Sequence, residues 1–220
     1  MSCNFDYQLK MTQNNSNNLS KTAFLFSIIV AIVVGIFFLI TGKTNSFQII
    51  NGNHSVLFDL FFRYITFLGD GTIWIPIVVY CFFYKRKYLS TVFLGFLIST
   101  LLTHFFKRII FPDEFRPIVF LAKDFPIHIV KGVKMYRINS FPSGHTATAF
   151  TIAILLSSFT KNKATIFFFV FLAFLVGYSR VYLGQHFVTD IWFGICIGII
   201  SAFISVFYKK FYKVIVTEIK

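Results

Sequence analysis

Residues 22–41 read TAFLFSIIVAIVVGIFFLIT, an uncharged run of 20 residues. A helix that crosses a hydrocarbon core of about 30 Å needs about 20 mostly apolar residues, so this run predicts a membrane-spanning helix. Other apolar runs follow it along the chain. We therefore expect six spanning helices, at 22–41, 71–85, 88–106, 143–160, 164–180 and 187–208.

The run 56–68 is also apolar, but it contains Asp59 and Arg63. Two opposite charges within so short a run favour a helix that lies at the membrane interface over one that crosses the bilayer. Within the last span, Gly194 and Gly198 form a small-xxx-small pair, which predicts close packing against another helix.

The composition agrees with an all-α, polytopic membrane protein. Of the 220 residues 56% are hydrophobic and only 13% are charged, against about 25% charged in soluble domains. So much apolar material excludes disorder for most of the chain. It also argues against a soluble nucleic-acid-binding protein, although the net charge is +13. We divide the chain into a flexible N-terminal tail (1–21), a six-helix membrane domain (22–208) and a basic C-terminal tail (209–220).

Basic residues gather in three short segments that fall on one side of the predicted bundle. They lie between the second and third spans, between the fourth and fifth, and after the sixth: Lys85, Arg86, Lys87; Lys161, Lys163; Lys209, Lys210, Lys213. Cytoplasmic loops carry an excess of Lys and Arg. We therefore expect a multi-pass protein of the cytoplasmic (inner) membrane with both termini in the cytoplasm.

The opposite side, which would face the outer or periplasmic surface, keeps a smaller positive charge. This topology gives a net charge of +9 inside and +4 outside, and seven of the ten outer basic residues fall in the loop 107–141. One interpretation is a solvated loop, because loops can be translocated despite their charge. The other is an anion-binding site at the outer face.

Three polar segments stand at the predicted outer ends of different spans. The first runs from Lys107-Arg108 to Arg116-Pro117, and the second is Pro142-Ser143-Gly144-His145. The third is Ser179-Arg180, five residues, His186, three residues and Asp190. Because the topology places all three segments on one side, we expect their side chains to converge.

The first chemical feature of these segments is a set of groups suited to a phosphate. A helix that begins at Pro142-Ser143-Gly144, with Pro142 in its first turn, offers free backbone N–H groups to an anion. Arg116 and Arg180 present planar forks for phosphate oxygens, and Lys107 adds a point charge.

The second feature is a pair of histidines. His186 and Asp190 are spaced i and i+4, so they share one face of a helix. The carboxylate can bind one ring nitrogen of His186 and leave the other as a nucleophile. His145, on a different helix, can then act as the acid. This arrangement suits phosphoryl transfer without a metal.

The second and third segments resemble the signature of the type 2 phosphatidic acid phosphatase superfamily, which groups membrane lipid phosphatases with vanadium haloperoxidases and class A acid phosphatases. The resemblance implies a shared helical core and no cofactor or metal. It also implies that His186 forms a phosphohistidine, that Asp190 orients His186, and that His145 protonates the leaving oxygen. The phosphate-binding residues that it implies are Lys107, Arg116, Ser143, Gly144 and Arg180.

The first segment departs from the family pattern. The family has six residues between the Lys and the Arg-Pro pair, whereas eight separate Lys107 from Arg116. We assign the position to Lys107 and interpret Pro112-Asp113 as a longer turn, with Arg108 as the alternative.

The resemblance implies an anionic lipid as partner, either a phosphomonoester or a diphosphate. Undecaprenyl diphosphate is the first expectation, followed by lipid A phosphate and phosphatidylglycerol phosphate. Two other functions are possible: a lipid transporter or flippase, which would favour repeated halves and charges near the bilayer midplane, and a haloperoxidase-like enzyme. The sequence shows no repeated halves, its charges gather at one face, and six spans argue against the peroxidase.

Overall fold

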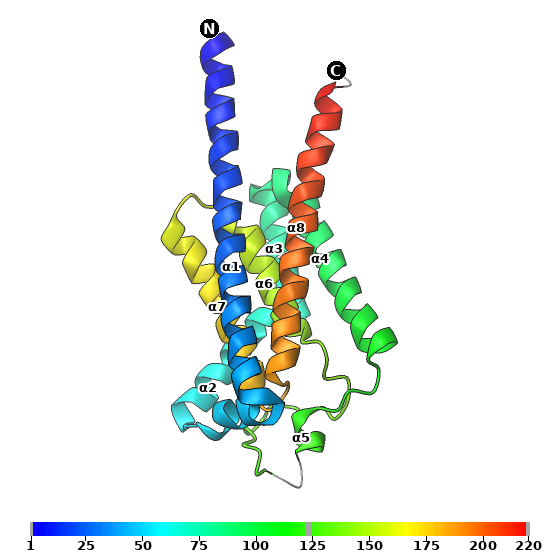
Figure 1. Cartoon of the computed structure of the whole chain (residues 1–220). Coiled ribbons are helices and arrows are strands. Elements are labelled where there is room, and N and C mark those ends of the chain that lie inside the picture. The colour runs from blue at the N-terminus through cyan, green and yellow to red at the C-terminus, as the bar shows by residue number, and fades with distance from the viewer. Residues whose placement is uncertain (1, 122–124, 219–220) are drawn as a thin grey trace.

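The computed structural model describes residues 2–121 and 125–218, and within these ranges it contains helices and no strand (Figure 1). The longer helices are α1 (Ser2–Gly52), α2 (Val56–Ile65), α3 (Trp74–Tyr84), α4 (Leu89–Phe105), α6 (Gly144–Ser157), α7 (Lys163–Tyr182) and α8 (Val188–Glu218). The short elements are η1 (Thr66–Gly69), η2 (Gly71–Ile73), η3 (Arg86–Tyr88), the π turn η4 (Phe106–Ile110) and α5 (Pro117–Phe120).

The predicted all-helical membrane architecture is confirmed, but the count of six spans is not. Four helices are long and apolar enough to cross a bilayer: Lys21–Gly52, Arg86–Ile110, Lys163–Tyr182 and Val188–Tyr208. The segments Val56–Gly69 and Gly71–Tyr84, bent by 56° at their junction, would together make a fifth. Helix α6 has only 14 residues, which is about 21 Å and shorter than a hydrocarbon core.

The terminal segments are more helical than the sequence predicts. Helix α1 begins at Ser2 and α8 runs to Glu218, so the described parts of both expected tails continue their neighbouring spans. Extending an existing helix avoids the cost of nucleation, which explains how a polar segment can join a span. The division into two tails and one membrane domain stays a prediction. Gly42, with φ of 76°, interrupts α1 between two helical parts.

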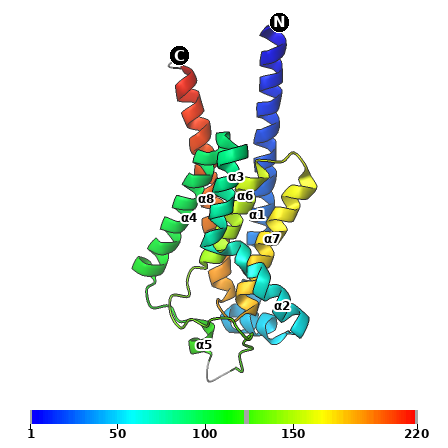
Figure 2. The ribbon, with the colours of Figure 1, turned by 180° about the vertical axis from the view of Figure 1, so that it is seen from behind.

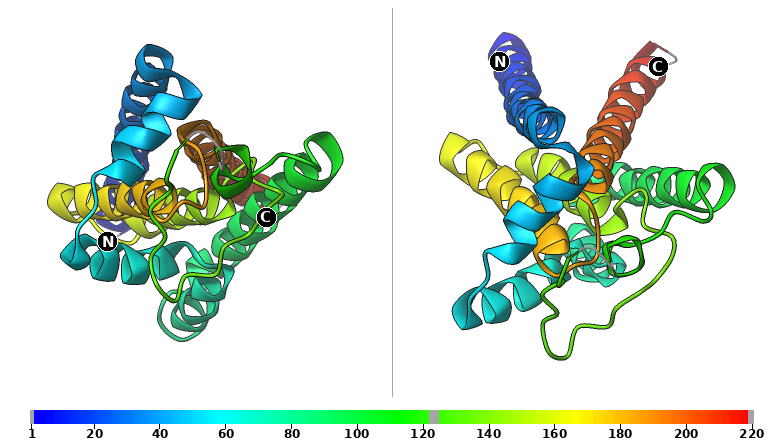
Figure 3. Two further views of the ribbon diagram at one scale, coloured as in Figure 1. Left: turned by 90° about the horizontal axis from the view of Figure 1, so that it is seen from below. Right: turned by 60° about the horizontal axis from the view of Figure 1, so that its bottom comes forward.

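The two ends of the bundle carry different elements. The termini lie together at one end, and α2, α5 and the connection from α4 to α6 lie at the other, which we call the site end (Figures 1 and 2). The connections α3–α4 and α6–α7, which carry two of the three basic clusters, lie toward the termini. Seen from the site end, the α4–α6 connection passes over the start of α8 (Figure 3). The separation of inner clusters from polar motifs is therefore as predicted.

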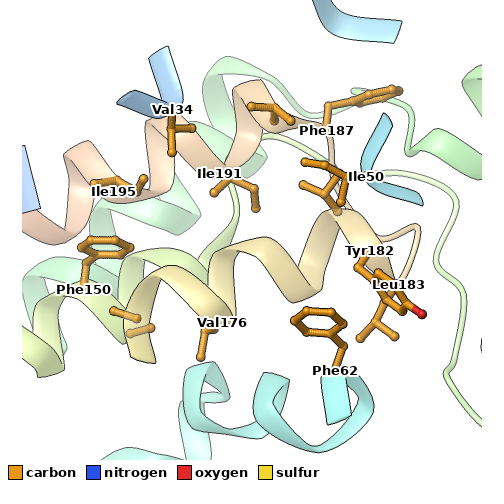
Figure 4. Close-up of a cluster of buried hydrophobic side chains, with 14 of the residues drawn as sticks. Val34, Ile50, Phe62, Phe150, Val176, Tyr182, Leu183, Phe187, Ile191 and Ile195 are labelled. Carbon is orange, nitrogen blue, oxygen red and sulfur yellow. The ribbon is translucent and has the colours of Figure 1, made fainter. Parts of the chain in front are cut away.

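Helix α6 is short, and the other helices enclose it. Ten of its 14 residues are buried, and it packs against α1, α4, α7 and α8. Phe150 of α6 joins Val176, Ile191 and Ile195 in the main hydrophobic cluster (Figure 4). With so little of α6 in contact with lipid, its length does not have to match the bilayer.

The glycines of α8 bring α6 close, as the small-xxx-small pair predicts. A Cβ at Gly194 would lie 2.7 Å from the carbonyl oxygen of Ser143, and one at Gly198 would lie 2.6 Å from the Cβ of Phe150. Both contacts are shorter than carbon atoms tolerate, so α8 has no room for a side chain at either position.

We predict that Gly198→Ala destabilises the protein, because the added methyl group forces α6 and α8 apart. Overpacking of this kind costs about 1–3 kcal/mol, which should lower the apparent melting temperature in detergent by several degrees. Gly71→Ala is the matched control, since a Cβ at Gly71 meets nothing within 4 Å. Equal melting temperatures for the two variants would contradict this account of the packing.

Candidate active site

The side chains that the three motifs contribute come from separate elements at the site end. These residues are Lys107 in η4, Arg116 at the N-cap of α5, Ser143 at the N-cap of α6, Gly144 and His145 in the first turn of α6, Arg180 near the end of α7, His186 in the α7–α8 connection and Asp190 in the first turn of α8.

His186 and Asp190 form a buried pair, as their spacing predicts. Nδ1 of His186 lies 3.1 Å from Oδ2 of Asp190, and each residue is 2% exposed. The same oxygen accepts hydrogen bonds from the backbone N–H of Phe187, at 3.1 Å, and from the hydroxyl of Ser140. Since the carboxylate acts on Nδ1, the proton of a neutral ring is held there and the lone pair is left on Nε2.

The electrostatic surroundings of His186 favour its neutral form. Burial lowers the pKa of His186 well below its ordinary value, and the positive charges of Arg116, Lys107 and Arg180 lower it further. A neutral imidazole has a free lone pair and can act as a nucleophile. All three cations therefore influence the charge state of this one ring.

Helix α6 begins one residue later than the sequence suggested. Ser143 is the N-cap and Gly144 the first helical residue, so Pro142 precedes the helix instead of lying in its first turn. The Ser143 hydroxyl accepts a hydrogen bond from the hydroxyl of Thr146 at 2.9 Å. The backbone N–H of Ser143 donates to the carbonyl of Asp190 at 3.0 Å. The next N–H groups, of Gly144 and His145, open the first turn, where a helix can bind an anion.

Arg116 is held by backbone carbonyls. Its guanidinium donates to the carbonyls of Ile138 (3.0 Å), Gln185 (2.9 Å) and Asn139 (3.3 Å), and it lies 5.2 Å from the ring centre of Tyr136. Besides contributing a positive charge, Arg116 therefore holds the second half of the α4–α6 connection against the turn that carries His186.

Arg180 keeps a donor free. Its Nη1 donates to the hydroxyl of Thr66 at 2.8 Å, and its Nε is buried without a hydrogen-bond partner. A buried donor without a partner is costly, so the group is suited to a ligand with acceptor oxygens, such as a phosphate.

The structure favours Lys107 over Arg108 for the first motif. Lys107 is half-buried and its charge acts on both His145 and His186, whereas Arg108 is exposed. Lys107 lies in the π turn, which is closed by the N–H of Phe111 donating to the carbonyl of Phe106 at 2.8 Å. A π turn accommodates an extra residue, which accounts for part of the unusual spacing to Arg116.

His145 faces the same cluster of charges as His186. The positive charges of Arg180, Lys107 and Arg116 act on its ring, and its side chain is 29% exposed. Its Nε2 lies 3.9 Å from Oδ2 of Asp70. The same three cations therefore act on both histidines, and His145 is the more exposed of the two.

Several residues that support the site are not among the site residues that the three motifs predict. Ser140 binds Asp190, Gln185 binds Arg116 through its carbonyl, Thr66 binds Arg180, and Asp70 faces His145. Thr66 and Asp70 are far from the motifs in sequence, and nothing in their neighbours marks them. Among the described residues, no group of three or more His, Cys, Asp or Glu side chains could hold a metal ion.

Comparisons with known proteins agree with this geometry. Residues 88–213 match the model of the PAP2 superfamily. A lipid A 4'-phosphatase of Porphyromonas gingivalis is 34% identical over 167 residues, which cover 72% of this chain and 69% of that protein. An undecaprenyl-diphosphatase of Sulfolobus acidocaldarius is 28% identical over 154 residues, 69% of this chain and 71% of that protein. The crystal structure of Aquifex aeolicus LpxE has a TM-score of 0.67 and 32% identity, and the match covers 74% of this chain and 94% of that one.

The helical architecture and these matches define a membrane protein of the lipid phosphatase class. The chain belongs to the PAP2 superfamily, and its homologues support a lipid phosphatase hydrolase in a membrane. The resemblance in the motifs is thereby confirmed.

The contrast between Lys107 and Arg108 can be tested by phosphate release. We predict that Lys107→Gln lowers kcat/KM by about 100-fold, as expected when one donor to a developing charge is lost. The matched variant Arg108→Gln should lower it by less than about threefold, because an exposed charge is screened by water. A larger loss in Arg108→Gln would reverse the assignment.

Proposed function

We propose that this chain is a lipid phosphatase that releases inorganic phosphate through a phosphohistidine at His186. The observation that carries the proposal is the buried His186–Asp190 pair surrounded by the charges of Lys107, Arg116 and Arg180. A flippase has no need of such a nucleophile.

The first step follows from the arrangement of the two rings. Nε2 of His186 attacks phosphorus, and the bond from phosphorus to the lipid oxygen breaks. His145 gives its proton to that oxygen, and the lipid alcohol leaves. The three cations and the first turn of α6 stabilise the charge that develops on the phosphoryl oxygens.

The second step returns the enzyme to its starting state. Neutral His145 takes a proton from water as the water oxygen attacks phosphorus, and the bond between phosphorus and Nε2 breaks. Asp190 keeps the imidazole of His186 in one orientation throughout, and it stabilises the positive charge that the ring carries in the intermediate. Inorganic phosphate then leaves. No step uses a metal ion.

The favoured substrate is the phosphomonoester of lipid A, because a relative that matches two thirds of this chain at 34% identity is named a lipid A 4'-phosphatase. This order differs from the expectation drawn from the sequence, which put undecaprenyl diphosphate first. Undecaprenyl diphosphate remains the second candidate, supported by the more distant undecaprenyl-diphosphatase. The attack on phosphorus is the same in both cases. The leaving oxygen belongs to a sugar in one case and to a lipid phosphate in the other.

We predict that the purified protein releases phosphate from lipid A, undecaprenyl diphosphate or phosphatidylglycerol phosphate, with lipid A the fastest. His186→Ala should lose at least roughly 10⁴-fold in kcat, because the nucleophile is gone. Acid-labile, alkali-stable phosphate should appear on the wild-type chain after rapid quenching and should be missing from His186→Ala. An excess of EDTA should leave the rate unchanged. Equal rates for His186→Ala and wild type would contradict the mechanism.

We infer that the site end faces the outside of the cell, because the termini and the basic connections share the opposite end. In a variant without the native cysteines, Asn53→Cys at the site end should react with a membrane-impermeant maleimide in intact cells. Lys161→Cys, exposed at the other end, should react only after lysis. The reverse pattern would place the site in the cytoplasm.

A further inference from the structure

Asp70 lies beside the active site although no motif contains it. It stands between η1 and η2, and its Oδ1 accepts a hydrogen bond from the N–H of Thr72 at 2.9 Å. The other oxygen, Oδ2, is 3.9 Å from Nε2 of His145. One carboxylate oxygen therefore fixes the local turn, and the second is directed at the ring.

The turn that carries Asp70 is held tightly against the site. A Cβ at Gly69 would lie 2.6 Å from the carbonyl oxygen of His145, so the backbone of η1 approaches α6 as closely as glycine permits. On the preceding residues of η1, the Thr66 hydroxyl accepts a hydrogen bond from Arg180. Asp70 is thus placed by contacts on both α6 and α7.

The charges around His145 explain what a carboxylate does there. Burial disfavours the protonated form of His145 most strongly, and the positive charges of Arg180, Lys107 and Arg116 disfavour it further. The negative charge of Asp70 acts in the opposite direction to these three cations and favours the protonated form of His145. Asp190 is already engaged with His186, so it does not serve His145 in the same way.

We propose that Asp70 is a positioning residue that orients His145 and opposes the loss of its proton before transfer to the leaving oxygen. This inference rests on the proposed phosphatase function. The site then contains two carboxylate–imidazole pairs with opposite tasks. Asp190 serves a buried, neutral nucleophile, and Asp70 serves a partly exposed acid.

The test uses substrates whose leaving groups need a proton to different degrees. An alkyl phosphate such as octyl phosphate needs protonation of the leaving oxygen, whereas nitrophenolate departs from 4-nitrophenyl phosphate without it. We predict that Asp70→Asn lowers kcat for the alkyl phosphate and for lipid A by about 10- to 100-fold, part of the usual contribution of an acid. Its kcat for 4-nitrophenyl phosphate should fall by less than about threefold, which also shows that the variant is folded.

The pH profile gives a second readout. Loss of the carboxylate weakens the hold of His145 on its proton, so the alkaline limb of kcat should move to lower pH by about one unit in Asp70→Asn. Asp70→Glu should restore most of the rate. Asp113→Asn, which removes an exposed acidic side chain at the same end, is the matched control and should change neither readout.

A double-mutant cycle separates this inference from the function itself. If Asp70 acts through His145, the double variant Asp70→Asn/His145→Ala should be no slower than His145→Ala alone. Equal losses on alkyl and aryl phosphates, or an unmoved alkaline limb, would overturn the role of Asp70. A wild-type protein that hydrolyses no phosphate ester would instead overturn the proposed function.

Discussion

The active site depends on the hydrogen bonds that one buried carboxylate, that of Asp190, accepts. A carboxylate removed from water is costly unless its oxygens accept hydrogen bonds. Here Oδ2 of Asp190 accepts hydrogen bonds from Nδ1 of His186, the N–H of Phe187 and the hydroxyl of Ser140. The backbone carbonyl of Asp190 accepts a further hydrogen bond from the N–H of Ser143. These bonds tie the start of α8 to the α7–α8 turn, the α4–α6 connection and the N-cap of α6. Segments that form the site therefore share one point of attachment.

Close packing of α6 and α8 makes this attachment possible. The carbonyl of Ser143 lies where a side chain at Gly194 would be, one turn beyond Asp190. A larger residue at that position would move the first turn of α6, with Ser143 and His145, away from His186. Arg116 adds a second constraint, because its bonds to Ile138 and Gln185 hold the α4–α6 connection against the turn. The site geometry thus follows from the helix interface beneath it.

The sequence revealed the parts of the site whose members are close along the chain. His186 and Asp190 lie one turn apart, and Ser143 precedes His145 by two residues, so their spacing in the sequence predicts that each pair lies close together. Thr66 and Asp70 could not be found in this way, because only tertiary packing brings η1 to α6 and α7. The count of six spans is not confirmed, because apolarity predicts α6 as a span whereas α6 has only 14 residues, ten of them buried. The flexible N-terminal tail stays a prediction, although the described part of that segment continues α1 as a helix.

The unequal exposure of the two histidines gives the site a direction. His186 is 2% exposed, whereas the side chains of His145 and Asp70 are 29% and 39% exposed. In the proposed mechanism the lipid oxygen of the bound phosphate lies on the more exposed side, beside His145. Attack by His186 from the buried side would then give the in-line arrangement that phosphoryl transfer requires. The two imidazoles differ in surroundings, because His186 is buried against Asp190 whereas His145 faces Asp70 at the more exposed side.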